Sequence, residues 1–220
     1  MDTTSETNNN ERLVQVPAGA VILSGFLSIP EGTRGIILFV DTTNSDRYKY
    51  IARLVREEGI ATLLVSLLTP EDEAWDQETS FFRDNVDVLH QRIIGIANWL
   101  NEDQNTQNLR ICYCGTGVSG AAALVAAAER PDLPISVISI AGRLDLAKDY
   151  LAKVEAATLL LAGENDSSSV NMSREGLEQL HGDKQFETIP GTGDLFEQEN
   201  TQQEVARLAG QWFERHLGLG

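Results

Sequence analysis

The segment best suited to chemistry is a glycine-rich turn, Cys114–Gly120, which joins an apolar run to an alanine-rich run. The apolar run predicts a buried strand and the alanine-rich run predicts a helix. A strand, a sharp turn and a helix in this order form the elbow on which many hydrolases place a nucleophilic serine, within the pattern G-x-S-x-G. Gly117 stands at the central position of that pattern. Because glycine has no side chain, the sequence predicts the elbow without its nucleophile.

Ser119 is an alternative nucleophile, because Gly117–Ala121 reads G-x-S-x-A two residues further on. Short motifs of this kind have low specificity. With Gly117 at the elbow, Ser119 falls in the first turn or at the N-cap of the following helix, where a serine hydroxyl accepts bonds from free backbone N–H groups. We therefore favour capping over catalysis for Ser119, and we place Val118 beside the elbow as a pocket residue.

Polar residues also follow the other apolar runs that predict strands: Asp41–Thr42, Arg143, Asp166 and Asp194. In parallel sheets, ligands bind beyond the carboxyl ends of the strands. We therefore expect the three aspartates to approach one another around Gly117, where like charges raise one another's pKa values or recruit a cation. Arg143 is the expected counter-ion, and a divalent cation held by oxygen ligands is the alternative. No motif spacing supports a metal site, so we assign no metal ligand and expect no cofactor.

The three histidines do not supply a base for the elbow. His90 and His216 fall inside predicted helices, and His181 precedes Gly182 at a predicted helix end. Imidazole is the usual general base because its pKa lies near working pH. None of the three follows a predicted strand, so we expect each to be structural or solvated.

The acidic segment 69–80 follows a predicted strand and contains five carboxylates together with Trp75. Its polar composition predicts a solvated loop at the rim of the site. A tryptophan in such a loop is unusual, since large aromatic side chains often anchor protein partners. Trp75 could therefore anchor a partner or cover the pocket.

Cys112 and Cys114 are two residues apart on a predicted strand, so both side chains point to the same face of the sheet. Neighbours on one strand are poorly placed for a disulfide. A thiolate metal site needs more thiols or nearby histidines than the chain supplies. We expect both cysteines to be buried strand residues.

Alternating strands and helices predict the fold class. A hairpin (13–16 and 21–29, with a turn at 17–19) is followed by expected strands at 35–40, 60–67, 109–114, 135–140, 157–162 and 185–189, and by expected helices at 47–58, 81–101, 119–130, 172–181 and 202–216. Strands that are apolar along their whole length indicate a mostly parallel sheet covered by helices on both faces. The sequence predicts an α/β protein with a disordered leader, 1–12, and a single domain, 13–220.

Charge and length exclude several classes of function. The chain has 220 residues, 42% of them hydrophobic, and a formal net charge of −16. Coulomb repulsion opposes binding to nucleic acid or to an anionic membrane surface. No apolar stretch reaches the roughly 18 residues of a membrane span, and the first residues lack the features of a signal peptide. We expect a cytoplasmic protein.

At this point the sequence resembles the dienelactone hydrolase branch of the α/β-hydrolases, from the hairpin to the last helix. The stretches that carry the resemblance are 17–19, 50–55, 61–70, 120–128, 142–146 and 195–197. The resemblance implies the α/β-hydrolase fold. It also implies a serine or cysteine nucleophile at the elbow, an aspartate after a later strand and a histidine after the last strand.

Two members of that triad are absent from this chain. The family pattern places the nucleophile position at Gly117, the acid at Asp166 and the base at Asp194. A carboxylate with a pKa near 4 is a poor proton acceptor at neutral pH. The loop that often opens His-Gly in relatives, and supplies an oxyanion N–H, begins Asp41–Thr42 here. We therefore expect an inactive hydrolase relative that binds a small molecule or a protein partner.

Two other functions stay open. One is a weak or rewired esterase or lactonase that uses Ser119 as its nucleophile. The other is a pocket lined by Asp41, Asp166 and Asp194 that binds a cation or a small ligand. Neither alternative requires a cofactor.

Overall fold

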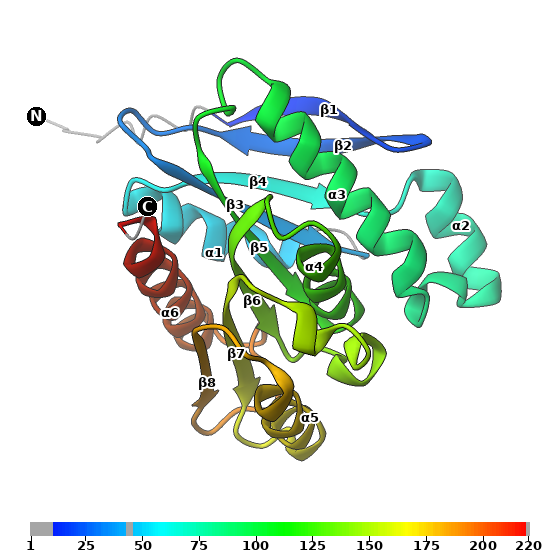
Figure 1. Cartoon of the computed structure of the whole chain (residues 1–220), viewed down its shortest axis with the longest axis vertical. Coiled ribbons are helices and arrows are strands. Elements are labelled where there is room, and N and C mark those ends of the chain that lie inside the picture. The colour runs from blue at the N-terminus through cyan, green and yellow to red at the C-terminus, as the bar shows by residue number, and fades with distance from the viewer. Residues whose placement is uncertain (1–10, 43–45, 219–220) are drawn as a thin grey trace, which may run out of the picture.

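The computed structural model describes residues 11–42 and 46–218, and it is built around one eight-stranded sheet with the order β1-β2-β4-β3-β5-β6-β7-β8. The first two strands form an antiparallel hairpin, β2 is also antiparallel to β4, and the remaining pairs are parallel (Figure 1). This is the mostly parallel sheet with an N-terminal hairpin that the sequence predicts. The strands are β1 Arg12–Ala18, β2 Val21–Ser28, β3 Gly35–Asp41, β4 Ala61–Ser66, β5 Arg110–Thr116, β6 Pro134–Ile140, β7 Ala157–Gly163 and β8 Lys184–Ile189.

Helices cover both faces of the sheet, and their bounds are α1 Asp46–Glu57, α2 Pro70–Thr79, α3 Val86–Glu102, α4 Gly117–Glu129, α5 Ser167–Gln179 and α6 Glu199–Leu217. Helices α1 and α6 pack on one face, and α3, α4 and α5 lie on the other (Figure 1). Every residue of β3 and of β7 is buried, as expected for parallel strands enclosed on both sides. Cys112 and Cys114 are free, buried and on the same face, as predicted.

The hairpin turn lies two residues later than predicted. Pro17 and Ala18 belong to β1, and the turn is formed by Gly19 and Ala20. Gly19 has a φ of +70°, which glycine adopts without steric cost, so it fixes the position of the turn. Residues 1–10 of the expected leader lie outside the described residues, and Arg12 is already part of β1.

The acidic segment after β4 forms helix α2, so the prediction of a loop there is wrong. Thr69 is the N-cap, and its hydroxyl accepts a bond from the Asp72 N–H at 3.1 Å, while the Asp72 carboxylate accepts one from the Thr69 N–H at 2.9 Å. Pro70 is the first helical residue, where its missing N–H costs nothing. These capping interactions stabilise the first turn of α2, although the helix has no apolar face.

Two further helices differ from the expected bounds. The long helix expected at 81–101 is divided into a 3₁₀ turn, Phe81–Arg83, and helix α3. Helix α5 begins at Ser167 instead of residue 172, because Asp166 caps it. None of the described helices is long and apolar enough to cross a membrane.

Candidate active site

The turn between β5 and α4 has the backbone geometry of a nucleophile elbow. Strand β5 ends at Thr116 and helix α4 begins at Gly117, whose φ is +54°. A Cβ built on Gly117 would have no atom of the described residues within 4 Å. Thr116, Gly117 and Val118 are all partly exposed. The elbow therefore reaches the surface, and there is room for a side chain at position 117, where glycine carries none.

Two other glycines let strand and helix approach closely behind the elbow. A Cβ on Gly115 would lie 2.6 Å from the carbonyl carbon and oxygen of Ser119, and a Cβ on Gly120 would lie 2.6 Å from the Ser139 hydroxyl. A real Cβ essentially never approaches another heavy atom this closely, and backbone atoms of Ser119 and Gly115 stand in the way at the two positions, so glycine is the residue that fits at each. The tight turn is thus preserved even though its central side chain is missing.

Ser119 neither caps the helix nor reaches the surface, so the expectation that it caps α4 is wrong. It is the third residue of α4, behind the N-cap Thr116, whose side chain makes no capping bond. The Ser119 side chain is fully buried, and its hydroxyl has no hydrogen-bond partner among the described residues. A hydroxyl in this position cannot meet a substrate that approaches the exposed side of the elbow.

Tyr48 of helix α1 contacts the elbow, which the sequence analysis missed. Its hydroxyl is hydrogen-bonded to the Thr116 hydroxyl, and the residue is fully buried. The Tyr48 ring packs 5.2 Å from the Phe39 ring and 5.4 Å from the Phe196 ring, measured between centroids. No local sequence signal indicates this contact, because it depends on how α1 packs against the end of β5.

Arg143 lies beside the elbow but does not neutralise the three aspartates, so its expected role is wrong. Its backbone N–H donates to the Gly117 carbonyl at 3.0 Å. Its guanidinium forms two bonds to Asp145, at 2.9 and 2.8 Å, and one to Asp84 at 3.0 Å. These bonds from Arg143 hold the pKa of Asp145 below its usual range. Each of the three guanidinium nitrogens therefore donates a hydrogen bond to Asp145 or Asp84, and these two carboxylates balance the charge of Arg143.

Asp166, the position of the triad acid, caps helix α5. Its carboxylate accepts bonds from the hydroxyl and from the backbone N–H of Ser169. The bond from the Ser169 hydroxyl, ahead of the opposing effect of partial burial, holds the pKa of Asp166 below its usual range. A carboxylate in this position stabilises the first turn of helix α5.

Asp194, the position of the triad base, is exposed in the loop after β8. Its carboxylate accepts a bond from the Phe196 N–H at 2.9 Å, and its carbonyl accepts one from the Thr192 hydroxyl at 2.7 Å. Both bonds are local to the turn. The side chain therefore shapes the loop, and this position holds a carboxylate instead of the imidazole that the triad uses.

Asp41 is buried at the end of β3, where its carboxylate accepts a bond from the Thr42 N–H at 2.8 Å. The continuation of this loop, 43–45, lies outside the described residues. Within the described residues, no group of three or more histidine, cysteine, aspartate or glutamate side chains could hold a metal ion. The expected cluster of Asp41, Asp166 and Asp194 is therefore not assembled as a cation site.

The histidines have structural partners away from the elbow. His90 is buried in α3, where its ring nitrogens lie 2.9 Å from the Val86 carbonyl and 3.1 Å from a Glu129 carboxylate oxygen. His216 is buried in α6 and lies 2.9 Å from an Asp183 carboxylate oxygen. His181 is exposed just after α5. Their placement agrees with the structural roles that the sequence predicts.

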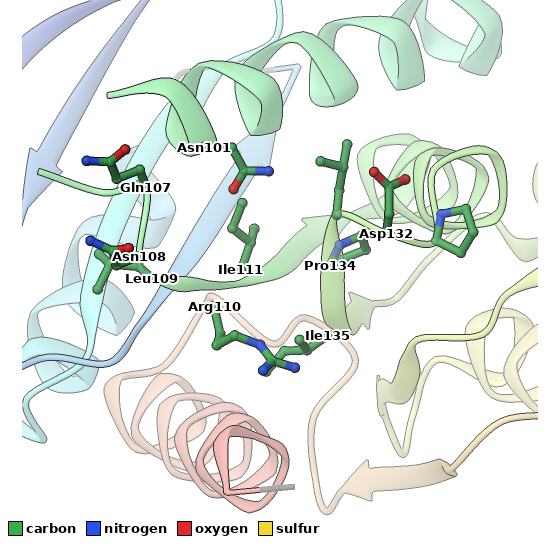
Figure 2. A pocket seen from close by; sticks show the side chains of 11 residues that line it. Asn101, Gln107, Asn108, Leu109, Arg110, Ile111, Asp132, Pro134 and Ile135 are labelled. Carbon is green, nitrogen blue, oxygen red and sulfur yellow. The ribbon is translucent and has the colours of Figure 1, made fainter. Parts of the chain in front are cut away.

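A cavity of about 340 Å³ lies at the amino ends of β5 and β6, at the end of these strands that is opposite to the elbow. Amide side chains, including Asn101 and Gln107, line one side, and Asp132 and Pro134 line the other (Figure 2). Asp132 is paired with Arg130 at 2.7 Å. Because ligands of open α/β sheets bind beyond the carboxyl ends, this cavity does not belong to the elbow site.

Comparison with known proteins shows what the whole chain is similar to. No family model matches the sequence. The chain is 36% identical to proteins from two Mycobacterium tuberculosis strains that are provisionally named phosphoribosyl transferase, with 99% of this chain and 49% of theirs covered. It therefore spans about half the length of these curated relatives.

Two solved structures match this chain over nearly their whole length. A dienelactone hydrolase from Anabaena variabilis is 40% identical, with a TM-score of 0.89, and covers 94% of this chain and 97% of its own. The esterase domain of a Rhodothermus marinus protein is 15% identical, with a TM-score of 0.74 over 94% of this chain and 100% of its own, and shares the fold. The first of these likenesses is high in both identity and coverage, so the chain belongs to the dienelactone hydrolase family and has the α/β-hydrolase fold.

Proposed function

We propose that this chain is a catalytically inactive member of the dienelactone hydrolase family that acts by binding a partner. The observation that carries the proposal is Gly117, which occupies the tip of an otherwise intact elbow. Acyl transfer at such an elbow needs a nucleophilic atom and a base beside it. The elbow has no side chain, and the position of the base is an exposed aspartate.

The contacts of the other triad positions support the same reading. Asp166 caps a helix and Asp194 bonds within its own turn, so each has a structural use that needs no substrate. Removal of one triad member typically leaves only about 10³ to 10⁴ of catalysis over water. Because this chain lacks two members, we propose that binding, and not turnover, accounts for its function.

The names of the longer relatives indicate a first class of partner. Relatives of about twice this length carry a phosphoribosyl transferase name, and that chemistry is not ester hydrolysis. We propose that this fold works together with a phosphoribosyl transferase, as a non-hydrolytic module. Co-elution of the purified chain with a phosphoribosyl transferase of the same organism in size-exclusion chromatography would support this pairing, and separate elution at micromolar concentrations would refute it.

Labelling with a broad-spectrum fluorophosphonate tests the absence of a nucleophile. The probe phosphonylates activated serines, and the adduct is read from the intact protein mass. We expect the wild-type chain and the Ser119→Ala variant to stay unmodified under conditions that fully label an active serine esterase. A stoichiometric adduct on the wild-type chain would refute the proposal.

The same experiment decides the second candidate, a rewired hydrolase that uses Ser119. The observation in its favour is a serine hydroxyl without a hydrogen-bond partner among the described residues. An adduct that maps to Ser119 and disappears in Ser119→Ala would establish this candidate. The complete burial of Ser119 leads us to expect no such adduct. No observation favours the cation-binding alternative, because the described residues hold no metal-binding group.

A further inference from the structure

We propose that helix α2 and the turn after it form a docking surface for a protein partner that presents two basic side chains on either side of an apolar patch. The surface consists of Glu71, Trp75, Glu78 and Phe81, and we call it the acidic aromatic face. The proposal deepens the binding role proposed above. Its test does not depend on hydrolase activity, so the two proposals can fail separately.

Helix α2 is held at its first turn by polar contacts although it contributes nothing to the core. None of its ten residues, all of them described, is buried. Short helices in water are marginal unless an apolar face packs against the protein. Here the reciprocal bonds between Thr69 and Asp72 fix the first turn, and Arg92 of α3 pairs with Asp72 at 2.7 Å. Burial raises the pKa of Asp72, but these bonds outweigh it and the net shift is downward.

The helix presents an aromatic side chain on a fixed base. Trp75 is 46% exposed, and its ring lies 4.5 Å from the Phe81 ring, which is 39% exposed. Both rings also contact Phe82, which is buried and lies under the Arg92 guanidinium. Exposed tryptophans held in one orientation lose little entropy on binding and often dominate interface energies. The tilted pair of rings is therefore suited to packing against an apolar patch.

Carboxylates flank the indole on the same face of the helix. Glu71 precedes Trp75 by four residues and Glu78 follows it by three, so all three side chains share one face. Seven helical residues span about 10 Å along the axis. Both glutamates are exposed, and neither forms an ion pair within the described part of the chain. A partner with lysine or arginine side chains at this spacing, on either side of an apolar patch, is complementary to this face.

The charge of the face also selects the class of partner. Polyanions such as nucleic acids and anionic membranes are repelled by these carboxylates and by the net charge of −16. The face adjoins the vacated elbow through one residue, because Asp84, three residues after Phe81, pairs with Arg143, and the Arg143 N–H bonds Gly117. A protein docked on α2 therefore reaches the segment that supports the elbow.

The test uses the full chain, labelled with ¹⁵N, and a synthetic helical peptide with two lysines seven residues apart and leucines between them. A second peptide has glutamates in place of the lysines. We expect the basic peptide to shift the Trp75 indole N–H signal and the amide signals of 71–83, and the acidic peptide to shift neither. Shifts spread over the whole acidic surface, or no shift at millimolar peptide, would overturn the proposal.

Matched variants separate this surface from general charge attraction. We expect Trp75→Ala to lower the affinity for the basic peptide at least tenfold. The double substitution Glu71→Gln and Glu78→Gln should lower this affinity several-fold. Glu102→Gln, which removes an exposed carboxylate at the far end of α3, should leave the affinity unchanged. All four substituted residues are exposed, so the variants should stay folded, and their circular dichroism spectra check this. Equal affinity in Trp75→Ala and the wild-type chain would overturn the proposal.

Discussion

The backbone N–H of Arg143 donates a hydrogen bond of 3.0 Å to the carbonyl of Gly117, and it ties the loop after β6 to the tip of the elbow. The bond uses only main-chain atoms, so it does not require a side chain at Gly117. Together with the close approach of Gly115 to Ser119, it explains how the elbow keeps its shape without a nucleophile. The scaffold of the site is thus retained independently of its chemistry.

The two glycines of the elbow should respond differently to alanine. In Gly117→Ala the new methyl group meets no described atom, and the cost of about 1 kcal/mol comes from the left-handed backbone. In Gly115→Ala the methyl group lies 2.6 Å from backbone atoms of Ser119, so we expect a loss of about 3 kcal/mol. Urea unfolding of both variants measures the two losses. Equal losses would contradict the packing described here.

The helix cap formed by Asp166 should make stability depend on pH. Asp166→Ala removes two bonds to Ser169, and we expect it to lower the free energy of unfolding by about 1 kcal/mol at pH 7. The pKa of Asp166 is depressed in the folded chain, so this contribution is complete above the unfolded pKa of about 4 and is lost as the pH falls through the folded value.

Urea unfolding of the wild-type chain and of Asp166→Ala at pH 7 and at a series of lower pH values measures that difference. The difference in unfolding free energy between the wild-type chain and Asp166→Ala should become smaller below pH 4. Ser168→Ala is a neighbouring control, because Ser168 is exposed and its side chain makes none of the capping bonds. A gap that stays constant or widens on acidification would show that the carboxylate does not act as an ionised cap.

The two cysteines should be unreactive in the native state. Burial raises the pKa of Cys112 to about 12 and raises that of Cys114 well above its usual range. Because the thiolate is the reactive species, iodoacetamide at pH 8 should modify neither residue until the chain is unfolded. Mass spectrometry with and without urea measures this. Modification of the folded chain within minutes would contradict the burial of this strand.

The sequence predicts the sheet well because its strands are enclosed on both faces. Runs such as those of β3 and β7 are almost entirely apolar and have no competing helical period. Helix α2 was missed because it has no apolar stripe, although Thr69, Pro70 and Asp72 form a recognisable start signal. The start of α5 was missed for a similar reason, since its serine-rich first turn reads as a loop until Asp166 is recognised as the cap.

The candidate site was predictable only in its local part. The bare elbow at Gly117 follows from adjacent residues, so the sequence alone indicates it. The partners of Arg143 do not, because Asp84 is 59 residues away and comes near only through the packing of α3. The contact of Tyr48 with Thr116 spans 68 residues and is hidden for the same reason. Long-range side-chain pairing depends on the tertiary structure and leaves no short-range pattern.

The rate at which the purified chain hydrolyses p-nitrophenyl acetate and a small unsaturated lactone tests the central claim most directly. The chain and its Ser119→Ala variant should both give the rate of buffer alone, because Gly117 carries no side chain and, among the described residues, His90 and His216 are paired away from the elbow. Saturable turnover by the wild-type chain, many times above that rate and retained in Ser119→Ala, would contradict the account.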